Sequence, residues 1–179
     1  MEIFDLFLQY RNEKRNAKKR IITEMFEIGS EIANDYYQLL KECEIKTRDN
    51  AVKPDDIIRE IEFRREKLHV RRQEARAMLQ ITYWEKNKAY KQLIYGISMI
   101  LCGDNAALYM SIADHHYGRC GHTLLDIIDR YEWTKRYFNN NNVLIMEEMR
   151  RIIKCQYEAV DKGVKEMTEG YYKLVQIYK

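Results

Sequence analysis

Apolar residues recur at intervals of three and four along most of this chain, and this spacing constrains the fold more than any other feature. One stripe of an α-helix would carry Ile22, Met25, Gly29, Ile32, Tyr36, Leu39 and Cys43. A second would carry Ile58, Ile61, Leu68, Ala75 and Leu79, and a third Ile153, Tyr157, Val160, Val164, Met167, Tyr171, Leu174 and Tyr178. One proline and seven glycines in 179 residues are too few for a turn-rich β protein. The sequence therefore predicts an all-α fold.

The first two stripes are separated by one short loop near residue 50. They predict a long antiparallel, coiled-coil-like helical hairpin over residues 2–102. Pro54 suits the first position of the second helix, and Asp55 and Asp56 suit the positive end of its dipole. This second helix is expected to continue to Cys102, with a kink near Gly96.

The rest of the chain predicts shorter helices followed by one long one. We expect short helices at 105–117 and 122–138 and a long C-terminal helix at 143–178. The asparagines at 139–142 predict a loop and a helix cap. No repeat or linker divides the sequence, which is expected to form a single domain over residues 1–179. The apolar stripe of the last helix is longer than two short helices can cover, which predicts a homodimer.

A loop centred near residue 50 also predicts which residues of the hairpin face each other. Apolar residues then meet in the pairs Ile32 with Leu68, Met25 with Ala75, and Ile22 with Leu79, while Phe4 and Leu8 approach Ile97 and Leu93. The same register places the acidic stripe of Glu24, Glu27, Glu31 and Asp35 beside Arg65, Arg72 and Arg76. We interpret the basic segment 64–76 chiefly as one side of such ion pairs.

That segment also contains Arg64 and His69, which are separated by four residues. The spacing resembles the Arg-x4-His motif of HEPN ribonucleases, in which arginine and histidine act on the scissile RNA phosphate. The resemblance covers these two positions and implies a ribonuclease with Arg64 and His69 as its catalytic pair. It stands as an alternative to the ion-pairing role.

A second basic cluster has few acids to balance it. We name Arg11, Lys14, Arg15, Lys18, Lys19 and Arg20 the basic stripe. Glu13 is the one acid within residues 10–20. With the nearby aromatic residues Tyr10, Tyr83, Trp84 and Tyr90, the basic stripe could hold phosphates and stack bases. It could equally bind an acidic protein surface or serve solubility alone. The net charge of +3 is too small to decide between these roles.

Three of the four histidines lie in Ala113–His122, "ADHHYGRCGH". His116, Cys120 and His122 could converge on a metal ion, whereas neighbouring histidines on a helix diverge by about 100°. As a helix-turn-helix, the segment would present Asp126 and Asp129 where base-reading side chains are needed. Gly118 and Gly121 favour a bend between two short helices, with no metal bound.

The remaining observations narrow the function. Four separated cysteines predict reduced thiols, and acids near the N-terminus argue against a signal peptide, so a cytosolic location is expected. No run approaches the ~20 apolar residues of a membrane span. Nucleotide-binding, serine-hydrolase and metalloprotease motifs are absent, and no cofactor is predicted.

These observations favour a non-enzymatic helical interaction protein. We expect it to bind a macromolecular partner, a protein slightly more than a nucleic acid, in a regulatory, accessory or inhibitory role of the kind found in bacterial or phage systems. Non-specific nucleic-acid binding through the basic stripe is the first alternative, and a HEPN-like ribonuclease is the second.

Overall fold

The computed structural model describes residues 2–82, 87–102 and 126–179, and this part of the chain is helical with no strand. Its helices are α1 (Glu2–Arg48), α2 (Pro54–Thr82), α3 (Lys88–Cys102), α5 (Asp126–Tyr137) and α6 (Asn142–Ile177). The all-α prediction is confirmed. The short helix predicted at 105–117, and the start of the one predicted at 122–138, lie outside the described residues.

The loops and helix starts follow local sequence signals. α1 ends at Arg48 and α2 begins at Pro54, so the loop near residue 50 is confirmed. The Asp49 carboxylate accepts a hydrogen bond from the Ala51 amide at 2.9 Å within this turn. Asn141 caps α6, because its side-chain oxygen accepts from the amides of Val143 and Leu144 at 3.0 and 3.3 Å.

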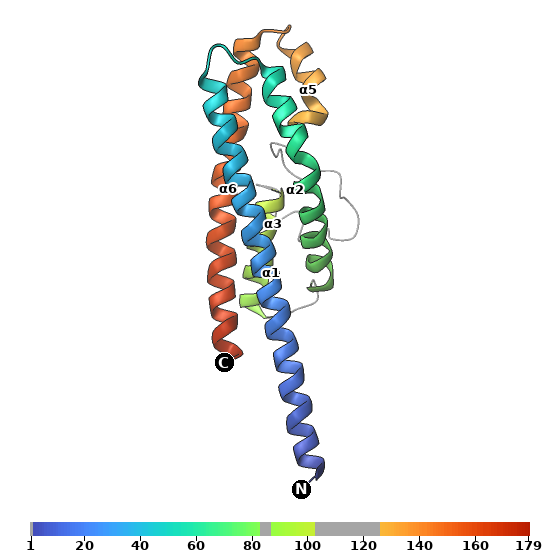
Figure 1. Ribbon diagram of the computed structural model, residues 1–179. Coiled ribbons are helices and arrows are strands. Elements are labelled where there is room, and N and C mark those ends of the chain that lie inside the picture. Colours follow the sequence, from blue (N-terminus) through green and yellow to red (C-terminus); the bar gives the residue numbers. More distant parts are fainter. Residues whose placement is uncertain (1, 83–86, 103–125) are drawn as a thin grey trace.

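The first predicted stripe forms one wall of the core. Every one of its members is buried: Ile22, Met25, Gly29, Ile32, Tyr36, Leu39 and Cys43. We name this line of residues the core stripe. The core stripe belongs to one buried cluster with residues of α2, α3 and α6, and all three helices pack against α1 (Figure 1).

The second helix of the hairpin is shorter than predicted. It ends at Thr82, and residues 88–102 form the separate helix α3. Asn87 caps that helix by accepting from the Ala89 and Tyr90 amides at 2.8 and 3.4 Å. The chain reverses between α2 and α3, so α3 runs parallel to α1 (Figure 1). The predicted approach of Phe4 and Leu8 to Ile97 and Leu93 is therefore wrong.

The closest helix pair in the bundle is α3 with α6. A Cβ atom built on Gly96 would lie 2.5 Å from the Gly163 carbonyl oxygen and would also meet the Met167 backbone nitrogen. One on Gly170 would lie 2.8 Å from the Ala89 carbonyl oxygen. The two backbones touch at these positions, which only small residues permit. Gly96 is thus a packing position within α3.

The C-terminal stripe is used inside the chain. Val160, Met167 and Leu174 are at most 1% exposed and belong to the core that α6 forms with α1 and α3. Tyr171 of α6 stacks on Phe26 of α1 with ring centroids 4.1 Å apart. The apolar surface from which a homodimer was predicted is therefore covered by the chain's own helices, and a homodimer stays a prediction without that support.

Candidate functional site

Among the helices that the structure describes, α2, α3 and α6 pack against α1 and all stop at about the same level along it. Three contacts show how these helices align along α1. They join Glu31 to Arg71 of α2, Met25 to Tyr90 of α3, and Phe26 to Tyr171 of α6. Counting along each helix from these contacts, the end of α2, the start of α3 and the end of α6 lie within about one turn of Arg20. Residues Glu2–Lys19 of α1 project beyond that level, as Figure 1 shows at the N-terminal end. We name them the arm.

Burial changes sharply where the arm leaves the bundle. Ile22 and Met25 are 2% and 1% exposed, whereas none of residues 8–21 is buried. The basic stripe lies almost entirely in the arm. The side chains of Lys14, Arg15 and Lys19 make no ion pair or hydrogen bond with any residue that the structure describes. These cations face solvent.

One member of the basic stripe departs from the prediction. Arg20 was expected to lack an acidic partner, but its Nε lies 3.9 Å from a Glu24 carboxylate oxygen one turn further along α1. Both side chains are more than half exposed, so the pair contributes little to stability. The predicted binding surface accordingly shifts towards the N-terminal part of the basic stripe.

The arm continues the core stripe in register but changes its chemistry. Stepping back from Ile22 at intervals of four, three, four and three gives Lys18, Arg15, Arg11 and Leu8. The line that is apolar and buried in the bundle is therefore basic in the arm and apolar again at Leu8. An open hollow lies along it, lined by Leu8, Arg11, Asn12, Lys14, Arg15 and Lys18.

The sequence predicted Leu8 in the hairpin but not on one line with the basic stripe, although the signal was present. The core stripe was predicted from its apolar residues, and these end at Ile22 in the N-terminal direction. Extending the same three-and-four spacing towards the N-terminus would have placed Lys18, Arg15 and Arg11 on the stripe.

Of the aromatic residues predicted to accompany the basic stripe, Tyr10 lies beside it and Tyr90 does not. Tyr10 is 61% exposed in the arm, but Tyr90 is 5% exposed and its hydroxyl lies 3.5 Å from the Met25 sulfur in the core. Tyr83 and Trp84 lie outside the described residues. The prediction of a base-stacking surface is wrong for Tyr90.

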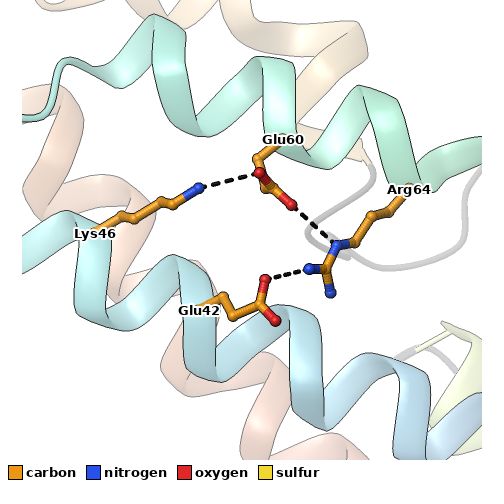
Figure 2. Close-up of polar contacts among 4 residues, drawn as sticks. All are labelled: Glu42, Lys46, Glu60 and Arg64. Carbon is orange, nitrogen blue, oxygen red and sulfur yellow. Dashed lines mark hydrogen bonds and ion pairs between the residues drawn. The ribbon is translucent and has the colours of Figure 1, made fainter.

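Arg64, one of the two residues that resemble the HEPN motif, is held in a network of ion pairs (Figure 2). Its guanidinium donates to Glu42 of α1 and, from Nε at 3.0 Å, to Glu60 of α2. Lys46 donates to the same Glu60 carboxylate at 3.1 Å. The hydrogen bond from Lys46 and the nearby positive charges lower the pKa of Glu60, although partial burial opposes them.

This network links helices α1 and α2 across the interface between them. The carboxylate of Glu42 also raises the pKa of Arg64 above its ordinary value. Such an arrangement fixes helix register. His69 lies in α2, but its side chain is not among those that the structure describes.

The predicted ion pairs of the middle of α2 are displaced by one residue. Arg71 pairs with Glu31 at 3.0 Å, in the place predicted for Arg72. Arg72 is 8% exposed and points inward, with Nη2 3.5 Å from the Leu101 carbonyl oxygen near the end of α3. The separate helix α3 causes this shift, because it gives the inner face of α2 a partner that the predicted hairpin lacked.

The metal candidates His116, Cys120 and His122 lie outside the described residues. Within residues 2–82, 87–102 and 126–179, no group of three histidine, cysteine, aspartate or glutamate side chains is placed to hold a metal ion. Cys43 is buried, which raises the pKa of its thiol to about 12 and makes it unreactive. None of the described helices is both long and apolar enough to cross a membrane.

Comparison with known proteins adds no relative. The chain matches no protein-family model, no curated protein and no solved structure.

Proposed function

We propose that this protein is a non-enzymatic helical interaction protein that binds an anionic macromolecular partner through the arm of α1, in a regulatory, accessory or inhibitory role. The observation that carries the proposal is the row of exposed cations beyond the end of the bundle. The side chains of Lys14, Arg15 and Lys19 have no ion-pair or hydrogen-bond partner among the described residues, and they lie on a helix that the bundle holds in place from Ile22 onwards.

The energetics of the arm support a bound partner. A helical segment of this length is only marginally stable in water when no tertiary packing supports it. Like charges four residues apart, as in Arg11 with Arg15 and Arg15 with Lys19, destabilise it further. A partner that places negative charge along the arm would remove this repulsion, so binding and helix order reinforce each other.

Charge reversal in the arm tests the proposal. We expect the combined variant Lys14→Glu, Arg15→Glu and Lys19→Glu to lose a partner that wild-type protein retains in affinity capture followed by mass spectrometry. The matched control reverses Lys41, Lys91 and Lys165, which are exposed and whose side chains make no ion pair or hydrogen bond with a described residue. Equal recovery of the same partner by both variants would assign binding to another surface.

The two alternatives make different predictions for the same proteins. A non-specific nucleic-acid binder would shift a short DNA duplex or RNA strand, and the shift would weaken steeply with salt. A HEPN-like ribonuclease would lose RNA cleavage in Arg64→Ala and His69→Ala while keeping its binding.

A further inference from the structure

We propose that the partner of the arm is an amphipathic α-helix of another protein, which carries carboxylates opposite Arg11 and Arg15 and an apolar residue opposite Leu8. This inference rests on the proposed function and names the chemistry of the partner. It follows from three features of the arm: its register with the core stripe, the order of side chains along it, and the position of its acid.

The register favours a helix as the occupant. Leu8, Arg11, Arg15 and Lys18 continue the three-and-four spacing by which the core stripe receives α2, α3 and α6. A second α-helix presents side chains at that same spacing, so it can lie along the arm as the bundle helices lie along the rest of α1. The partner helix would then lie along the arm, beyond the point at which α2, α3 and α6 end.

The order of side chains distinguishes a protein helix from a nucleic acid. The cations are bracketed on one line by apolar residues, Leu8 on one side and the buried Ile22 on the other. A phosphate backbone gains nothing from Leu8, whereas a helix with apolar and acidic positions satisfies both kinds of residue. Ile177, 53% exposed at the end of α6, offers a further apolar contact where the partner meets the bundle.

Charge excludes a second copy of the arm from this surface. Two arms that pair along Arg11, Arg15 and Lys18 would bring like charges together, which is strongly unfavourable. Glu13, the one acid among residues 8–20, lies two positions from Arg15 and therefore on the opposite side of the helix. Glu13 is therefore not placed to pair with Arg15, and a carboxylate on a helix of another chain can supply that charge.

A synthetic peptide provides a direct test. The probe is a helix-forming peptide of about three heptads with three glutamates along its seam and leucine at both ends of the seam. Fluorescence anisotropy should show that wild-type protein binds it at least about tenfold more tightly than the same peptide with glutamine in place of the glutamates. Arg15→Glu should abolish this difference, and a peptide with lysine as its central seam residue should restore binding to that variant.

Leu8→Gln separates the two classes of partner, with Lys165→Glu as the control. Weaker peptide binding in Leu8→Gln, with Lys165→Glu unchanged, supports a helical protein partner. If Leu8→Gln leaves the peptide affinity unchanged, or if a short DNA duplex binds more tightly than the glutamate peptide, the helical partner is wrong and the arm serves nucleic acid. If capture of the cellular partner survives charge reversal of the arm, the proposed function fails as well.

Discussion

At the scale of single residues, Arg64 shows how a short motif acquires a structural role. Its guanidinium has a fork of donors, and two carboxylates from different helices take two of them. A lysine at this position could not bridge Glu42 and Glu60 in the same way. Loss of Arg64 would leave Glu60 paired with Lys46, whereas Glu42 would lose its partner on α2.

We predict that Arg64→Ala lowers the free energy of unfolding by about 1 kcal/mol, because the pair is partly buried and part of a network. This corresponds to a fall in Tm of about 2–4 °C for a chain of this size. Arg59→Ala in the same helix is the control, since Arg59 is 74% exposed and pairs only with Asp56 one turn away. Equal losses in the two variants, measured by thermal denaturation, would contradict a register-fixing role for Arg64.

The same network predicts a dependence of stability on pH. The pKa of Glu60 is lower in the folded protein than its ordinary value. Its contribution is therefore fully present above the ordinary glutamate pKa and is lost as the pH falls through the folded value. The difference in stability between wild type and Arg64→Ala should accordingly shrink on acidification below the ordinary glutamate pKa.

At the scale of elements, the pairing of α3 with α6 depends on positions where any side chain would strike backbone. We predict that Gly96→Ala destabilises the fold by about 1–3 kcal/mol, because the helices must separate to admit the methyl group. Gly29→Ala is the matched control. Its Cβ would meet only side chains, those of Met167 and Ile97, and alanine gains up to about 1 kcal/mol in helix propensity. Urea denaturation should show a larger loss for Gly96→Ala; equal losses would mean that α3 and α6 are less closely packed than described.

The elements also show what the sequence could and could not predict. The three-and-four spacing identified the core stripe and the hairpin loop correctly, because both depend on local periodicity and on Pro54. The end of α2 was missed because residues 54–102 form an almost continuous helical pattern, and Asn87 was not recognised as a cap. Because Asn87 was not recognised, the predicted neighbours of Phe4 and Leu8 and the predicted ion pair of Arg72 were wrong. For the same reason the sequence did not predict that α2 and α3 leave the arm uncovered.

At the scale of the whole molecule, the buried side chains lie in the bundle, and the arm, to which we assign binding, carries exposed ones. The core is made by α1 from Ile22 onwards together with α2, α3 and α6. The arm adds no buried residue among residues 8–19, so these side chains contribute hardly at all to the core. Its orientation is nevertheless defined, because it is the direct continuation of a 47-residue helix that the bundle holds.

We therefore predict that removal of residues 2–19 leaves the bundle folded. Surface groups of this kind change the free energy of unfolding by no more than about 0.5 kcal/mol, and the urea m-value should be unchanged because the area buried on folding is the same.

In the protein that retains the arm, amide hydrogen exchange should be fast in residues 2–19 and slow from Ile22 to Cys43, since exchange follows local opening and only the second segment is packed. The complementary glutamate peptide should slow exchange in the arm alone. A large loss of stability on truncation, or slow exchange in the arm without peptide, would show that the arm folds back onto the bundle and is not the projecting surface that its exposed cations indicate.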